Sequence, residues 1–83
     1  MSSIEDYKLQ YLIKLYERTD NGSPQLSCSK SDIGCELNFD ETLTIKITKA
    51  LKSEGLIEFL SFQIIKITSD GINRIQLISS SSQ

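Results

Sequence analysis

The sequence predicts a single α+β domain that is mostly helical. Its 83 residues are enough for one domain and too few for two. Apolar side chains recur at three- and four-residue spacings in four segments, which is typical of amphipathic helices. Residues 56–68 are instead rich in β-forming side chains. The predicted order is helix, short strand, helix, tight turn, helix, hairpin and helix.

The first helix is predicted over residues 3–19. Ser3 can cap its start, and Asp6 stands three residues later, as in a capping box. Residues 20–24, which include Gly22 and Pro24, end the helix and turn the chain. Residues 25–27 are expected to be extended. The apolar side of this helix consists of Ile4, Tyr7, Tyr11, Leu12, Leu15 and Tyr16.

A compact second helix is predicted over residues 30–36 or 30–37, with Ser29 as its cap. Ile33 and Leu37 are expected to face the core. Gly34 lies inside this helix, where glycine costs about 1 kcal/mol relative to alanine. We therefore expect a neighbouring helix to pass close to Gly34.

The third helix is predicted over residues 40–53, after a tight link. Asp40 is its expected N-cap, and Gly55 follows its end in the manner of a helix C-cap. The expected inward residues are Leu43, Ile47, Ala50 and Leu51. The expected outward residues are Glu41, Thr42, Ile45, Thr48, Lys49 and Lys52, with Lys46 on the flank.

The remainder of the chain is predicted to form a hairpin and a last helix. Two short strands within residues 56–68 are joined by a turn near residues 60–62. A helix over residues 69–78 follows, capped by one of residues 68–70. The domain is thus expected to span residues 1–78, and residues 79–83 are expected to form a disordered polar tail.

Two parts of the chain resemble a known family. Residues 30–41 have the layout of a helix-turn-helix. Gly55-Leu56-Ile57 and Ile67-Thr68-Ser69-Asp70-Gly71 then follow in register. Together they resemble the winged-helix domains of small MarR-like, PadR-like or YjcQ-like regulators. The resemblance implies a three-helix core, a short β-hairpin wing and a C-terminal helix. It also implies sequence-specific binding of double-stranded DNA in transcription regulation, with residues 40–53 in the major groove.

The residues expected to bind DNA lie on and before the third helix. Between Thr42 and Ser53 there are three lysines and no acidic residue. Lysines can contact phosphates or guanine edges, and Ile45 can contact a thymine methyl group or mark a protein interface. A solvated helix face and a scattered surface hydrophobe are the alternatives. The predicted DNA-binding residues are Lys30, Ser31, Thr42, Ile45, Lys46, Thr48, Lys49 and Lys52.

Other features favour a winged-helix module that binds proteins and not DNA. The net charge is −2, whereas nucleic-acid-binding proteins usually carry a basic excess. Residues 58–65 contain no basic residue, and arginine is absent from the third helix. Residues 59–62 are expected to serve as a protein contact or as core. In the DNA-binding case a homodimer is expected, through the first and last helices.

The sequence argues against several other classes. Histidine is absent and there are only two cysteines, too few for a structural zinc site. Cys28 and Cys35 are expected to be free thiols, with Cys35 buried and unreactive. We therefore expect no enzyme, no metal, no cofactor and no small-molecule ligand. A signal peptide and a membrane span are not expected either, which predicts a cytoplasmic protein.

Overall fold

The computed structural model describes residues 4–19 and 27–81. This part of the chain is α+β and mostly helical, which confirms the predicted class at that level. In chain order the elements are α1 (Ile4–Arg18), β1 (Cys28–Ser29), α2 (Lys30–Glu36), α3 (Glu41–Ser53), β2 (Ile57–Phe59), β3 (Ile64–Ile67) and α4 (Ser69–Ser81).

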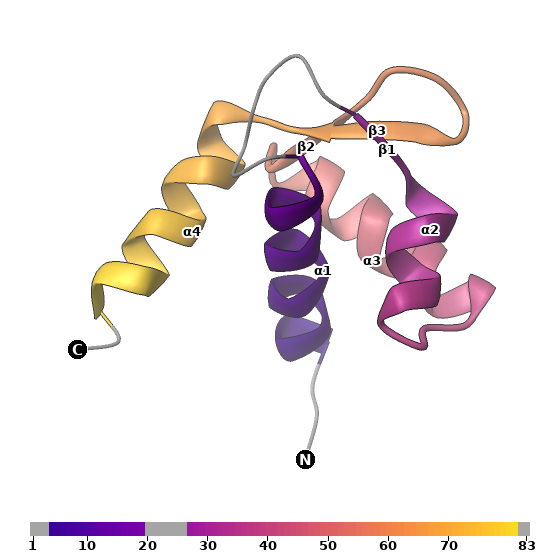
Figure 1. The fold of residues 1–83 in the computed structure, drawn as a ribbon, viewed down its shortest axis with the longest axis horizontal. Coiled ribbons are helices and arrows are strands. Elements are labelled where there is room, and N and C mark those ends of the chain that lie inside the picture. The colour runs from indigo at the N-terminus through magenta and orange to yellow at the C-terminus, as the bar shows by residue number, and fades with distance from the viewer. Residues whose placement is uncertain (1–3, 20–26, 82–83) are drawn as a thin grey trace.

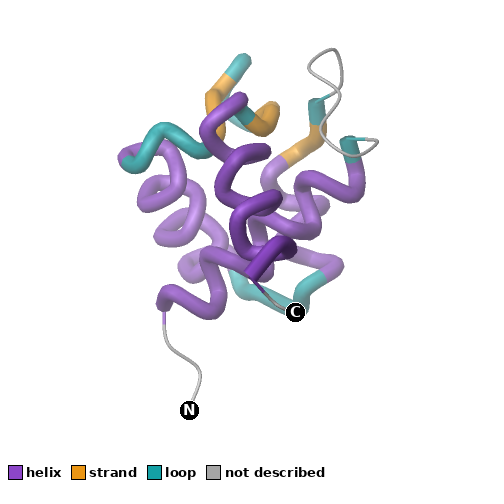
Figure 2. Tube along the Cα trace, turned by 90° about the vertical axis from the view of Figure 1, so that its left-hand side faces the viewer, coloured by secondary structure: helices purple, strands orange, loops and turns teal. Residues whose placement is uncertain are grey.

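The strands form a small antiparallel sheet on one side of the helices (Figures 1 and 2). The strand order is β1-β3-β2, so β3 is central. Ile57 pairs with Ile67 in the hairpin, and Cys28 pairs with Ile65 across β1 and β3. The hairpin is confirmed. The short strand was expected at residues 25–27 but is found at Cys28–Ser29, and residues 25 and 26 lie outside the described part of the chain.

Helices α2, α3 and α4 begin at, or within one residue of, the positions predicted from the sequence. Ser3 and the turn at residues 20–24 lie outside the described residues. Ser29 occupies the N-cap position of α2, but its side chain makes no capping hydrogen bond. This corrects the predicted role of Ser29, which is also the last residue of β1 and pairs with Ile64.

The caps of the later helices are formed by side chains and by glycine geometry. The Leu43 N–H donates to Asp40 Oδ1 at 2.7 Å, which confirms the cap of α3. Gly55 has a φ of +78°, a conformation that favours glycine. Thr68 caps α4, because its Oγ1 accepts from the Gly71 N–H at 3.1 Å. Helix α4 runs to Ser81, so residues 79–81 belong to the helix and not to the predicted tail.

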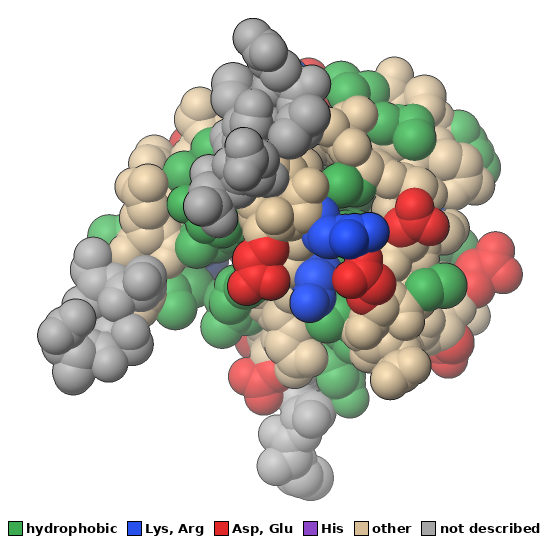
Figure 3. Space-filling model, in the orientation of Figure 1, with side chains coloured by type: hydrophobic (Ala, Val, Ile, Leu, Met, Phe, Trp, Pro, Cys, Tyr) green, Lys and Arg blue, Asp and Glu red, His purple; other side chains and the backbone are tan. Residues whose placement is uncertain are grey.

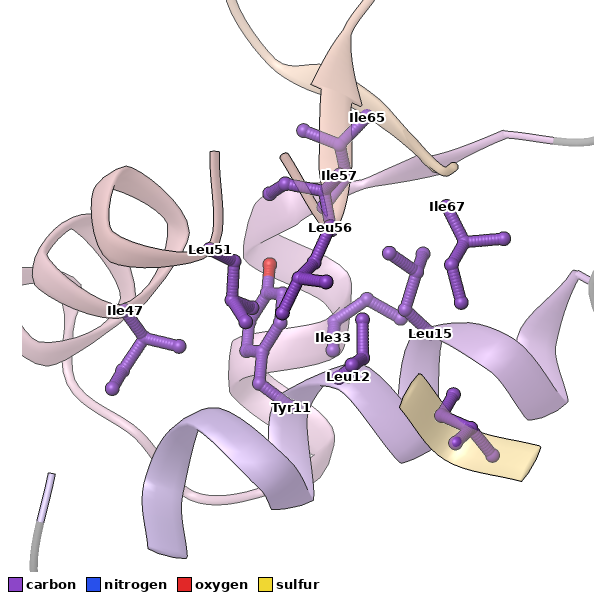
Figure 4. Packing of buried hydrophobic residues seen from close by; sticks show 11 residues of the cluster. Tyr11, Leu12, Leu15, Ile33, Ile47, Leu51, Leu56, Ile57, Ile65 and Ile67 are labelled. Carbon is purple, nitrogen blue, oxygen red and sulfur yellow. The ribbon is translucent and has the colours of Figure 1, made fainter. Parts of the chain in front are cut away.

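One buried cluster joins all four helices and the sheet (Figure 4). In Figure 1, α1 lies between α4 and α2 beneath the sheet, and it packs against α2, α3, α4 and β3. The hairpin follows the end of α3, and Leu56 and Ile57 at its start are buried in the same cluster. The buried hydrophobic residues are Tyr11, Leu12, Leu15, Ile33, Ile47, Leu51, Leu56, Ile57, Ile65, Ile67 and Ile75.

Helices α2 and α3 approach each other most closely at Gly34. A Cβ atom added to Gly34 would lie 2.3 Å from Thr44 Oγ1 of α3. The turn between the helices is equally tight, with Asn38 at a φ of 61° and the Phe39 N–H donating to the Gly34 carbonyl at 2.8 Å. The predicted close passage of a helix at Gly34 is therefore confirmed.

Replacing Gly34 with alanine is expected to destabilise the protein. The added methyl group must displace Thr44, and overpacking of this kind costs about 1–3 kcal/mol in the free energy of unfolding. Equilibrium urea denaturation followed by circular dichroism measures the change. In a Thr44→Ala background the same substitution should cost much less. If Gly34→Ala instead stabilised the chain, by up to the roughly 1 kcal/mol of helix propensity, the close contact would be refuted.

Candidate functional site

The predicted DNA-binding residues lie around α3 and the start of α2, but they are not equally accessible. Most of them lie on α3, which packs beside the β2–β3 hairpin. The exposed members are Ser31, Thr42, Lys46, Lys49 and Lys52. Lys30 and Ile45 are half-buried.

Thr48 does not belong to the exposed surface, which corrects its predicted role. Its side chain is only 1% exposed. Its hydroxyl donates to the Thr44 carbonyl at 2.9 Å, one turn earlier in α3, so it needs no water or ligand partner. Thr44 and Thr48 both lie on the buried side of α3, and Thr44 faces Gly34 of α2.

A groove runs between α3 and the tip of the β2–β3 hairpin. Its volume is about 600 Å³. Ile45 and two phenyl rings make it largely apolar, and lysines stand around it. We call it the α3–hairpin groove. Its lining residues are Lys30, Ile45, Thr48, Lys49, Lys52, Phe59, Ser61 and Phe62.

Lys30 connects the helical part of this groove to the hairpin. Its Nζ lies 5.0 Å from the ring centroid of Phe62 and 5.5 Å from that of Phe59, within the range of cation–π contacts. Its backbone is held on both sides: its N–H donates to the Gln63 carbonyl at 2.9 Å, and its carbonyl accepts from the Tyr11 hydroxyl at 2.8 Å. Burial of Tyr11 raises the pKa of that hydroxyl, so it stays a donor.

The hairpin segment expected to be a protein contact or core is partly packed against the core and partly exposed. Phe59 is half-buried against the core. Leu60 is 52% exposed and Phe62 is 81% exposed. The sequence alone did not place Phe59 and Phe62 beside Lys30. The only signal for Phe62 was an aromatic residue at the expected turn of a hairpin.

The basic residues fall into two groups according to their ion pairs. Five of the nine are paired with glutamates: Lys8 with Glu5 and Glu54, Lys14 with Glu17, Arg18 with Glu36, Lys66 with Glu58, and Arg74 with Glu54. The hydrogen bond to Glu54 raises the pKa of Lys8. On the face in Figure 3, basic side chains likewise lie beside acidic ones. Within the described residues, no ion pair is formed by Lys30, Lys46, Lys49 or Lys52.

The four lysines without an ion pair lie on α3 and at the start of α2. Three lie on α3, and Lys30, at the start of α2, lines the α3–hairpin groove together with Lys49 and Lys52. No acidic residue lines this groove. A smaller hollow of about 280 Å³, which Phe62 also lines, does include Glu41. The unpaired positive charge is therefore concentrated on α3 and on the groove beside it.

Known proteins do not identify this arrangement: no protein-family model, curated protein or solved structure matches the chain. Among residues 4–19 and 27–81, no three Cys, Asp or Glu side chains gather as they would around a metal ion. None of the helices within these residues has both the length and the apolar character needed to cross a membrane. The features that bear on function are the lysines of α3 and the α3–hairpin groove.

The two cysteines are free, as expected, but Cys35 is exposed and not buried. It stands two residues after Ile33, which is about 200° around the helix from that core residue. The expectation that burial makes Cys35 unreactive was therefore wrong. Cys28 is half-buried in β1, and burial raises the pKa of its thiol.

Alkylation of the native protein should therefore modify Cys35 before Cys28. The thiolate is the nucleophile, so the raised pKa of Cys28 lowers its reactive fraction at pH 8, and its burial limits access. Limited treatment with iodoacetamide and peptide mass spectrometry measures both sites. In urea the two rates should converge. Faster labelling of Cys28 in the native state would contradict the packing of β1.

Proposed function

We propose that this chain is a winged-helix domain and binds double-stranded DNA sequence-specifically, as a small transcription regulator. Three features support the winged-helix assignment. Helices α2 and α3 are joined by a tight turn, as in a helix-turn-helix. The β2–β3 hairpin follows α3 directly and forms the wing, with β1 as a third strand. Helix α4 closes the chain after the hairpin.

The distribution of unpaired cations carries the DNA-binding proposal. In a chain of net charge −2, the basic residues without an ion pair in the described structure are Lys30 and the three lysines of α3. A lysine already paired with a glutamate gains less from a phosphate, because the glutamate must first be displaced. Unpaired lysines on one helix can each displace counterions from the DNA backbone. This favours α3 as the recognition helix.

The remaining residues of α3 supply base contacts in this proposal. Thr42 is exposed in the first turn and can hydrogen-bond to a base edge or a phosphate. Ile45 is half-buried at the edge of the α3–hairpin groove, where it can contact a thymine methyl group. Ser31 lies at the start of α2, and its Oγ is 3.4 Å from Gln63 Oε1, too long for a strong hydrogen bond. It therefore remains available to a phosphate.

A protein-binding module is the second candidate function, and the hairpin favours it. Leu60 and Phe62 are both more than half exposed, and they stand close together on one turn. Large exposed apolar side chains of this kind are typical of protein interaction sites. In this alternative α3 and the hairpin would contact a protein partner, and the lysines would lie at the rim.

The DNA-binding proposal also includes a homodimer formed through α1 and α4. These helices pack against each other, and each retains an exposed apolar side chain: Ile4 is 38% exposed and Leu77 is 68% exposed. A second copy would cover these residues and double the number of base pairs contacted.

The dimer should depend on Leu77. Leu77→Asp places a charge on the proposed interface and should convert a dimer to a monomer in sedimentation equilibrium, because an unpaired buried charge is strongly unfavourable. Leu60→Asp is the matched control, since Leu60 is similarly exposed but lies on the hairpin. A wild-type protein that is monomeric at high concentration would exclude the homodimer.

Replacing Lys46, Lys49 and Lys52 together with glutamate should abolish DNA binding. Fluorescence anisotropy with a mixed-sequence duplex, repeated across a salt series, measures both affinity and salt dependence. If each lysine neutralises one phosphate, the slope of log K against log salt should weaken by about 0.9 for each lysine that is replaced.

The matched control replaces Lys14, Lys66 and Arg74 with glutamate. It changes the net charge by the same amount, but at cations that are already paired. It should retain most of the affinity and of the salt slope. Equal losses of affinity in both variants would mean that net charge, and not α3, governs binding. A wild-type protein that binds no duplex even at low salt would leave the protein-binding alternative.

A further inference from the structure

The α3–hairpin groove has a chemistry that duplex binding by α3 does not use. Contacts in the major groove need the outward lysines and the start of α3. They leave no role for the two phenyl rings that line the groove. Phe62 in particular keeps 81% of its surface in water.

The composition of the hairpin turn limits what this surface can bind. Residues 60–63 are Leu, Ser, Phe and Gln, so the turn itself offers no positive charge to a phosphate. Cations come instead from outside the hairpin, from Lys30 at the start of α2 and from Lys49 and Lys52 on α3. The groove is thus lined by both aromatic rings and lysines.

We propose that this groove binds an unpaired nucleobase, stacked on Phe62, while Lys30, Lys49 and Lys52 contact the phosphates of the same strand. This rests on the proposed function and specifies its ligand, DNA that has at least one base out of the duplex. Rings for stacking and cations that follow the backbone are the two components of single-stranded nucleic-acid sites.

Charge complementarity supports a nucleic-acid strand as the occupant. The lining of the groove includes three lysines and no acidic residue. The Lys30 Nζ lies over one face of the Phe62 ring, 5.0 Å from its centroid, so a base stacked on the other face places a nucleotide beside this ammonium group. An acidic peptide also satisfies the lysines. However, an apolar peptide anchor needs an enclosing pocket, whereas the Phe62 side chain is 81% exposed.

A base that is already unpaired should be favoured over one in a perfect duplex. Extruding a paired base costs unpairing and unstacking, and this cost is smallest where the base is bulged or single-stranded. Stacking on one aromatic side chain gives about a tenfold gain in affinity, which corresponds to about 1.4 kcal/mol.

The test compares two fluorescent DNA ligands of the same sequence: a perfect duplex and that duplex with one extra, unpaired adenine. Anisotropy titrations give both affinities for each protein. Wild type should bind the bulged duplex about tenfold more tightly. Phe62→Ala and Phe62→Leu should remove the preference and leave perfect-duplex binding unchanged, whereas Phe62→Trp should retain it. Leucine keeps an apolar side chain without a ring, so it separates stacking from hydrophobic contact.

Leu60→Ala is the matched control, because Leu60 is on the same turn but does not line the groove. It should keep the preference. Equal affinities of wild type for both ligands, or a preference that survives in Phe62→Leu, would overturn the base-stacking site while DNA binding by α3 stands. Binding of neither ligand at low salt would overturn both proposals. Binding of an acidic, leucine-containing peptide that Phe62→Ala abolishes, with no bulge preference, would assign the groove to a protein partner.

Discussion

The close contact between α2 and α3 at Gly34 determines which side of α3 faces the solvent. A side chain at Gly34 would collide with Thr44, so only glycine lets the helices approach this far. This contact lies on the buried side of α3, which also holds Thr48, and the lysines of α3 lie on the exposed side. Thr48 tolerates burial because its hydroxyl donates to the Thr44 carbonyl. The charged surface of α3 and the adjoining groove therefore both depend on this contact.

Local signals in the sequence predicted most of the fold. Asp40 caps a helix through its own side chain, and Gly55 allows a positive φ, so both act within a few residues of their own position. Thr48 and Cys35 were assigned to the wrong environment for a different reason. A threonine that bonds to its own helix fits either face, and the seven-residue helix α2 is too short for apolar spacing to fix which face Cys35 occupies.

The candidate site was only partly predictable, because its properties arise between distant segments. Glu54 follows Lys52 closely in sequence, yet it pairs with Lys8 and Arg74 from α1 and α4. Lys30 and Phe62 are far apart in the chain and meet because the Lys30 N–H bonds to the Gln63 carbonyl beside the β1–β3 pair. Which lysines are unpaired, and which rings they contact, follows from tertiary packing and not from spacing.

When the sequence is considered alone, the negative net charge and the uncharged turn of the hairpin both argue against a nucleic-acid ligand. The structure weakens both arguments. Exposed charges farther apart than about 10 Å are largely screened at 0.1 M salt, so local charge matters more than the total of −2. Most acidic partners of the paired cations lie away from the groove, whose lining contains no acidic residue. The positive charge that the hairpin turn lacks is supplied from α2, because Lys30 places its ammonium group beside Phe62. An apolar hairpin turn is thus compatible with a nucleic-acid ligand wherever a neighbouring helix provides the cation.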